Sequence, residues 1–203
     1  MEREIELSIL QRARKGDSAA FEEIVRAHEK TVYNLALRTL GNREDAEDAV
    51  QETFLKAYMA LSGFRGESRL SVWLYRIASN VCTDVLRRRR ETVSLSAEDE
   101  NGERELEIED FRFDPAAVTE RRDLCGAVRR ALDALPDASR RVLLLREIAG
   151  LSYDEIARAL EIDVGTVKTR IFRGRKKLCV LLSENGNFFR AGASNSSEGG
   201  DQA

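Results

Sequence analysis

Apolar residues recur every three to four positions along almost the whole of this 203-residue chain, which is the spacing of α-helices. Runs of β-branched residues bounded by turn residues, which would mark strands, are missing. We therefore predict an all-α fold. The helices are expected at residues 4–15, 18–40, 42–61 and 71–90 and, after a break, at 117–134, 137–149, 152–160 and 164–182.

The break between the two groups of helices is acidic and has no helical period. Residues 91–118 carry a net charge of −8, and Pro115 lies near the end of the stretch. A flexible linker is the simplest account of so long a segment without an amphipathic pattern. The end of the chain is rich in Gly, Asn and Ser and is expected to be disordered. The predicted organisation is a first domain at 1–91, a linker at 92–116, a second domain at 117–182 and a disordered tail at 183–203.

The charge of the whole chain hides a contrast between its parts. In total, 33 Lys and Arg residues oppose 36 Asp and Glu residues, for a net charge of −3. Residues 1–90 nevertheless carry +2 and residues 119–182 carry +5, on either side of the acidic stretch. Such asymmetry indicates a nucleic-acid partner.

The number and spacing of the cysteines and histidines, together with the hydropathy of the chain, exclude several classes of protein. The cysteines at positions 82, 125 and 179 form no paired motif, and His28 is the single histidine. We therefore predict no metal site, no disulfide framework, no cofactor and no catalytic residue, and so no enzyme. No apolar run approaches the ~18 residues that span a bilayer, and the first residues do not resemble a signal peptide. We expect a cytoplasmic protein with no membrane insertion.

The last two predicted helices form a helix-turn-helix pattern. Residues 151–160 are a short amphipathic helix, residues 161–165 a tight connection, and Asp163 can cap the helix that follows. That last helix has six basic residues and no acidic one. It is apolar on one face, and on the other it carries Thr169, Phe172, Arg173 and Lys176, flanked by Lys168. Such a helix suits the major groove of DNA, whereas the alternative is a solvated basic face on a bundle helix.

Two helices of the first domain have unusual outer faces. The helix at 71–90 carries a stripe of Arg76, Asn80, Thr83, Arg87 and Arg90, which could follow a phosphate backbone. The alternative is an exposed face whose basic end is favoured by the helix dipole. On the helix at 43–61, carboxylates surround two outward aliphatic residues, which indicates a protein-binding surface or, alternatively, a solvated acidic face.

Three motifs in this order resemble the extracytoplasmic-function class of bacterial sigma factors, in the sigma-70 family. They are residues 45–54 (DAEDAVQETF), 73–80 (WLYRIASN) and 165–170 (GTVKTR), and the resemblance covers about residues 5–182. It implies that the first domain is sigma domain 2 and the second is sigma domain 4. It also implies an alternative sigma factor, which binds RNA polymerase core and directs promoter-specific transcription initiation.

The resemblance assigns partners and residues. It implies that polymerase core is contacted at the β′ clamp and the β flap, and it assigns core binding to Asp45, Asp48, Gln51, Glu52, Phe54 and Leu55. The helical period by itself places Phe54 nearer the core of its domain. By the same resemblance the linker threads the polymerase cleft, and an anti-sigma factor held between the two domains is an expected partner.

Contacts with promoter DNA follow from the same resemblance. The loop that captures a flipped minus-10 base, together with the helix after it, corresponds to Phe64, Arg65, Gly66, Glu67, Ser68, Arg76, Asn80, Thr83 and Arg87. Minus-35 recognition corresponds to Thr166, Lys168, Thr169, Arg170, Phe172, Arg173 and Lys176. Trp73 is left with two roles, a wedge during strand opening or a buried side chain beside Ile77.

Two other functions are alternatives to a sigma factor. A stand-alone helix-turn-helix regulator would share only the second domain, and it would normally add a ligand-binding or receiver domain. Residues 1–90 lack the alternating strands of a receiver. A helical enzyme would need a nucleophile with its base or a phosphate-binding glycine loop, and the sequence offers neither.

Overall fold

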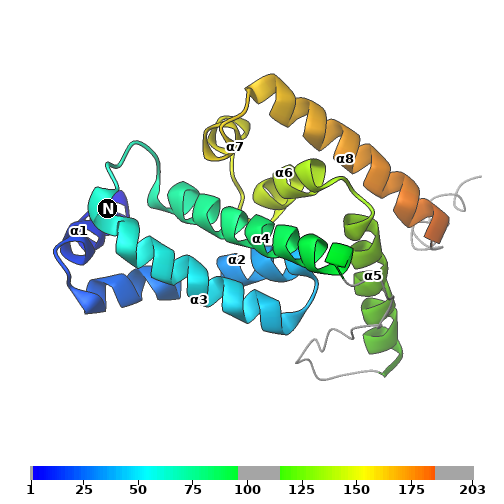
Figure 1. Ribbon diagram of the computed structural model, residues 1–203, viewed down its shortest axis with the longest axis horizontal. Coiled ribbons are helices and arrows are strands. Elements are labelled where there is room, and N and C mark those ends of the chain that lie inside the picture. The colour runs from blue at the N-terminus through cyan, green and yellow to red at the C-terminus, as the bar shows by residue number, and fades with distance from the viewer. Residues whose placement is uncertain (1, 96–114, 186–203) are drawn as a thin grey trace, which may run out of the picture.

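A computed structural model describes the backbone of residues 2–95 and 115–185, with the side chains of residues 7–91 and 124–184. The first half contains α1 (Glu2–Arg14), α2 (Ser18–Leu40), α3 (Arg43–Ala60), the short 3-10 turn η1 (Leu61–Gly63) and α4 (Leu70–Leu95). The second half contains α5 (Pro115–Asp133), α6 (Asp137–Glu147), α7 (Tyr153–Leu160) and α8 (Val164–Asn185) (Figure 1). Every regular element in these ranges is helical, as the periodicity predicts.

Local capping explains why several helix ends agree with the sequence. Asp17 accepts hydrogen bonds from the backbone N–H groups of Ala19 and Ala20 at 3.0 and 3.1 Å, which satisfies donors that the first turn of α2 leaves open. Gly41 ends α2 in the left-handed region at φ 77°, where a side chain would be strained. Asn42 accepts from the backbone N–H of Asp45 and so starts α3.

Other helix ends differ from the prediction. The helix predicted at 71–90 begins one residue earlier, at Leu70, and in its first turn the backbone N–H of Trp73 donates a hydrogen bond to the carbonyl of Arg69. Residues 92–95, assigned to the linker, continue α4, and residues 115–116 already belong to α5. Residues 183–185, assigned to the tail, are the last residues of α8. The rest of the predicted linker and tail, residues 96–114 and 186–203, lies outside the described residues.

Small residues set the close packing in each half. Where α2, α3 and α4 meet, Ala46 and Ala49 of α3 are buried against Val81 and Cys82 of α4. In the second half α8 lies directly on α6 at Gly174, where an added Cβ would come within 2.6 Å of the Leu143 side chain. Side chains of this size let the helix axes approach and exclude water from the apolar surface between them.

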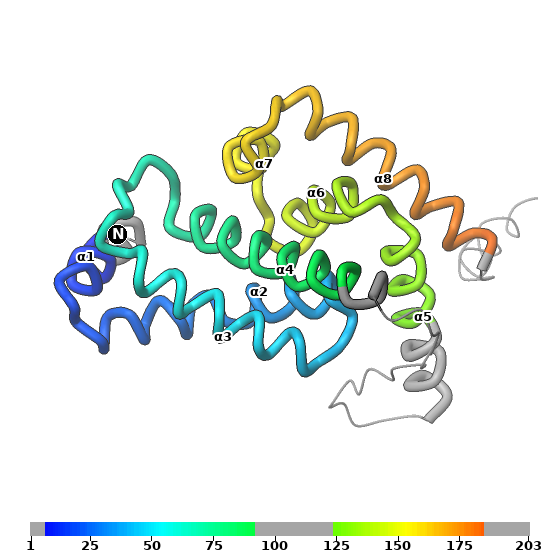
Figure 2. The backbone as a smooth tube through the Cα atoms, in the orientation of Figure 1, coloured from blue at the N-terminus to red at the C-terminus, as the bar shows by residue number. Residues whose placement is uncertain are grey.

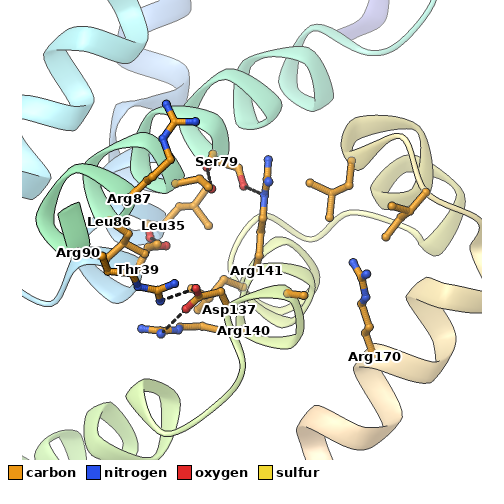
Figure 3. A pocket seen from close by; sticks show the side chains of 15 residues that line it. Leu35, Thr39, Ser79, Leu86, Arg87, Arg90, Asp137, Arg140, Arg141 and Arg170 are labelled. Atoms are coloured by element: carbon orange, nitrogen blue, oxygen red, sulfur yellow. Dashed lines mark hydrogen bonds and ion pairs between the residues drawn. The ribbon is translucent and has the colours of Figure 1, made fainter. Parts of the chain in front are cut away.

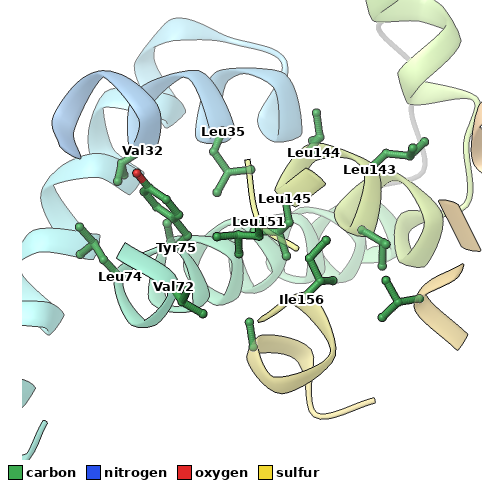
Figure 4. Close-up of a cluster of buried hydrophobic side chains, with 14 of the residues drawn as sticks. Val32, Leu35, Val72, Leu74, Tyr75, Leu143, Leu144, Leu145, Leu151 and Ile156 are labelled. Atoms are coloured by element: carbon green, nitrogen blue, oxygen red, sulfur yellow. The ribbon is translucent and has the colours of Figure 1, made fainter. Parts of the chain in front are cut away.

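The two halves share one hydrophobic core. Leu35 of α2 and Tyr75 of α4 belong to the same buried cluster as Leu145, Leu151 and Ile156 of the second half (Figure 4). Between the halves α6 packs against α2 and α7 against α4, and the backbone tube shows α8 on the outer side (Figure 2). We call this packing the closed arrangement. The sequence predicts two units on a tether, and it does not predict that they bury apolar surface against each other.

Candidate nucleic-acid interface

The outward face of α8 is formed as the helix-turn-helix pattern predicts. Val167 and Ile171 are 0 and 2% exposed and fix the inner side of the helix. The opposite side exposes Lys168, Thr169, Phe172, Arg173 and Lys176, and the Phe172 ring is 70% exposed. None of the three basic residues in this set makes an ion pair with any residue that the structure describes. We call these five residues the recognition face.

The turn before α8 has a detail that sequence reasoning missed. Glu161 lies in the left-handed region at φ 55°, the one non-glycine residue of the described ranges with positive φ. Asp163 then accepts a hydrogen bond of 2.6 Å from the Gly165 N–H, so the predicted cap is present. Glu161 therefore ends α7, with its backbone N–H donating to the Ala157 carbonyl, and Asp163 caps the start of α8.

Two basic residues of α8 lie away from the recognition face. Arg175 forms an ion pair of 2.5 Å with Glu147 of α6, and this hydrogen bond raises the pKa of the Arg175 side chain. Arg170, assigned to minus-35 recognition, is half-buried and lines a cavity between the two halves (Figure 3). Its position sets it apart from the other predicted minus-35 residues.

The polar stripe on α4 faces the second half in the closed arrangement. Arg141 of α6 donates to the Ser79 hydroxyl at 2.6 Å and also to the side-chain oxygen of Asn80. Arg76 lies 3.8 Å from Glu161, and Thr83 donates to the backbone oxygen of Ser79 at 2.7 Å. Residues assigned to the minus-10 element are therefore partly engaged by the protein itself.

The four consecutive arginines at the end of α4 all have acidic partners. These ion pairs are Arg87 with Asp84 at 3.4 Å, Arg88 with Glu52 at 3.9 Å, Arg89 with Asp45, and Arg90 with Asp137 at 2.5 Å. Two of the acidic partners were assigned to polymerase binding. Because Asp45 and Glu52 lie at the junction of α3 and α4 and are half-buried, they contribute to packing in the first half.

The loop between η1 and α4 differs from the prediction at its aromatic residue. Phe64, expected to be exposed for base capture, is 6% exposed and packs against Trp73 with ring centroids 5.0 Å apart. This contact explains the burial, and it places Trp73 as a half-buried packing residue. The loop itself is exposed at Arg65, Gly66 and Glu67, with Ser68 half-buried, beside a cavity of about 560 Å³. Arg158 and Glu161 of the second half form its opposite wall.

The outer face of α3 combines acidic and apolar side chains. Leu55 and Met59 are 60 and 73% exposed, next to Asp48 and Gln51. Tyr58, 48% exposed, completes the patch and was missed, although it is three positions after Leu55 on the same side of the helix. We call these five residues the docking face. Phe54 is 8% exposed and belongs to the core, so its assignment as a contact residue is corrected.

Within the described ranges, no group of three or more His, Cys, Asp or Glu side chains is placed to hold a metal ion. No helix in that part of the chain has both the length and the apolar character needed to cross a bilayer.

Comparisons with known proteins agree with this geometry. The family Sigma-70 region 2 matches residues 24–92, and the family Sigma-70, region 4 matches residues 125–178. The RNA polymerase sigma-H factor of Pseudomonas aeruginosa is 37% identical over 174 residues, which are 84% of this chain and 90% of that protein. The ECF RNA polymerase sigma factor SigW of Bacillus subtilis is 38% identical over 172 residues, 83% of this chain and 92% of that protein.

A solved structure shows the same fold. CnrH, in complex with the cytosolic domain of CnrY, superposes with a TM-score of 0.66 at 30% identity, covering 88% of this chain and 97% of that one. One family region lies in each half of the structure. The chain belongs to the sigma-70 family and is an alternative sigma factor of the extracytoplasmic-function class.

Proposed function

We propose that this sigma factor reads the minus-35 element with the recognition face of α8. The observation that carries the proposal is the exposed cationic surface around Phe172, whose basic residues have no acidic partner in the described part of the chain. Lys168 and Arg173 can donate to base edges or phosphates, and the phenyl ring can cover a thymine methyl group in the major groove.

The docking face of α3 is the proposed contact with polymerase core. Exposed aliphatic and aromatic side chains are costly in water unless a partner covers them, and here three of them gather on one helix. The neighbouring Asp48 favours a basic partner surface. The resemblance to sigma factors names that partner as the β′ clamp, and it assigns the β flap to the second half.

Minus-10 recognition is proposed for the loop residues Arg65, Gly66, Glu67 and Ser68 together with Arg76, Asn80, Thr83 and Arg87 of α4. In this proposal Phe64 packs against Trp73 at the base of the loop and does not stack on a DNA base. In the closed arrangement Arg141 donates to the side-chain oxygen of Asn80, and Arg76 lies 3.8 Å from Glu161, so DNA that binds this stripe would have to displace both contacts. Binding to polymerase would supply the energy to break them, because core contacts both halves in this proposal.

A regulatory protein partner and a cytoplasmic location follow from the same proposal. The solved relative CnrH is held by a second polypeptide, the cytosolic domain of CnrY. We infer an anti-sigma factor for this chain, which would compete with polymerase for the protein. Bacterial RNA polymerase and the chromosome share the cytoplasm, and a sigma factor acts there.

The polymerase contact can be tested by reconstituted transcription. Sigma-free core polymerase is mixed with the full-length protein, and affinity for core and transcript yield are both measured. Asp48→Arg and Met59→Asp should each weaken core binding by at least about tenfold. Glu29→Arg, which reverses an exposed charge on α2 away from the docking face, is the matched control and should bind normally. Unchanged affinity for both docking-face variants would refute the assignment.

The promoter contact needs a separate test, which also distinguishes a stand-alone regulator. Lys168→Ala and Arg173→Ala should each weaken minus-35 binding by about 1–3 kcal/mol if they contact bases. A scrambled duplex is the control, because equal losses on both duplexes would make these residues phosphate contacts. A protein that binds promoter DNA tightly by itself and leaves core polymerase inactive would favour the stand-alone regulator.

A further inference from the structure

A cavity of about 420 Å³ lies between α4, α6 and α8, where the two halves meet (Figure 3). Five arginines line it, with one carboxylate: Arg87, Arg90, Arg140, Arg141, Arg170 and Asp137. The rest of the wall is formed by hydroxyl groups and aliphatic side chains. A volume of this size falls in the range of small-molecule sites, about 300–1,000 Å³, and is far too small for duplex DNA.

Acidic residues do not balance the positive charge of this cavity. Asp137 is shared between Arg90 at 2.5 Å and Arg140 at 3.0 Å, and Arg140 also contacts Asp133 at 3.0 Å. Arg87 lies 3.4 Å from Asp84 on its own helix. These two clusters account for three of the five guanidinium groups.

The remaining two arginines make no ion pair with a carboxylate in the described part of the chain, although the charge of Asp84 also acts on Arg141. Arg141 is half-buried and donates to the neutral side chains of Ser79 and Asn80. Burial lowers the pKa of the Arg141 side chain, although a guanidinium stays charged at neutral pH. Arg170, also half-buried, makes no ion pair or hydrogen bond with any described residue. A half-buried charge without a counter-ion is unfavourable, and an anion would relieve that cost.

We propose that this cavity binds a small polyphosphorylated molecule, whose phosphate groups lie between Arg87, Arg141 and Arg170. The planar guanidinium donates two parallel hydrogen bonds to phosphate oxygens, so clustered arginines suit phosphate better than a single carboxylate. The aliphatic part of the wall would contact the organic body of a nucleotide-like ligand. An inorganic polyphosphate would make the contacts between phosphate and arginine but not the contacts with the aliphatic wall.

Such a ligand would stabilise the closed arrangement. Arg87 belongs to the first half, whereas Arg141 and Arg170 belong to the second, so the complete site exists only when the halves are packed together. A ligand that binds one arrangement and not the other shifts the population toward the one it binds. This inference does not depend on which residues read the promoter, because anion binding is measured without DNA or polymerase.

The test is titration calorimetry on the full-length protein with three probes: orthophosphate, tripolyphosphate and ATP. We expect saturable binding of tripolyphosphate or ATP at one site, at least about tenfold tighter than orthophosphate, with a rise in Tm. Arg141→Gln and Arg170→Gln should each weaken binding by at least about tenfold. Arg26→Gln, an exposed arginine of α2 outside the cavity, is the matched control.

Several results would overturn the proposal. Equal affinity of orthophosphate and tripolyphosphate would indicate general counter-ion binding at the surface. Unchanged affinity in both cavity variants would place the anion elsewhere. If a short single strand of DNA binds and both cavity variants weaken that binding, while tripolyphosphate does not bind, these arginines belong to a nucleic-acid site. If Arg141→Gln does not fold, Arg170→Gln decides the question, because Arg170 has no hydrogen bond to a described residue that its loss would break.

Discussion

An ion pair between Arg69 of the first half and Glu155 of the second links the two halves, and its loss should be measurable. The Arg69 guanidinium lies 2.6 Å from the Glu155 carboxylate, and its Nε donates to the same oxygen at 2.7 Å. The Glu155 side chain is 12% exposed, whereas that of Arg69 is 57% exposed. Burial by itself would raise the pKa of the Glu155 carboxyl, but hydrogen bonds from Ser152 and Arg69 outweigh it and hold that pKa below its ordinary value.

The expected loss of unfolding free energy follows from the unequal exposure of these two side chains. Hydrogen bonds to a charged group are worth about 1.5–3 kcal/mol when enclosed, and exposed ion pairs about 0–1 kcal/mol, so Arg69→Ala should cost about 1–2 kcal/mol of unfolding free energy. Because the pKa of Glu155 is lower in the folded state, its stabilisation is complete above the unfolded value of about 4.3 and is lost as the pH falls through the folded value. The cost of Arg69→Ala should therefore shrink in acid.

Urea unfolding at neutral pH and at a pH near 3 measures both effects. Arg76→Ala is the comparison, because its partner Glu161 is 82% exposed and 3.8 Å away. That variant should lose no more than about 0.5 kcal/mol. The reasoning fails if both variants lose the same free energy, or if the loss in Arg69→Ala does not depend on pH.

Three further predictions concern the core, the thiols and one turn. Leu145→Ala should lower the unfolding free energy by about 2–5 kcal/mol in urea unfolding, because Leu145 is 0% exposed in the core that both halves share. Burial raises the pKa of the Cys82 thiol to about 12, so iodoacetamide at pH ~8 should label exposed Cys179 and leave Cys82 unlabelled until the protein unfolds, as mass spectrometry would show. Gly41→Ala should cost about 1 kcal/mol or more in thermal unfolding, because φ is 77° at that position.

Sequence alone was sufficient for features decided by neighbours along the chain. The starts of α2 and α3 agree with the predicted ranges within one residue, since the Asp17 and Asn42 caps need only the backbone of the next turn. The inner and outer sides of α8 also agree, with Val167 buried and Phe172 exposed. These are interactions over three or four residues, so helical spacing contains the information.

Features decided by distant neighbours were not predicted. Phe64 is buried because Trp73, nine positions later, packs against it, and no periodicity spans the loop between them. For Phe54, the helical period and the family resemblance gave opposite predictions. The helical period correctly placed it inward, whereas the resemblance assigned it to the surface. The acidic partners of Arg88 and Arg89 come from α3, about forty residues earlier in the chain, and became visible only once the helices were packed.

In the closed arrangement the two proposed promoter surfaces differ in their contacts with the rest of the protein, because their helices lie in different places. The recognition face of α8 is on the outer side of the second half, so Phe172 and Arg173 stay exposed when the halves are packed. The stripe of α4 borders the second half: Asn80, Thr83 and Arg87 are exposed, but Arg141 donates a hydrogen bond to Asn80. Opening the halves must break the Arg141 contacts and expose part of the shared core, including Leu145. Under the proposed assignments, minus-10 binding competes with the Arg141 contact and minus-35 binding does not, so the junction between the halves is where a partner or ligand would regulate this protein.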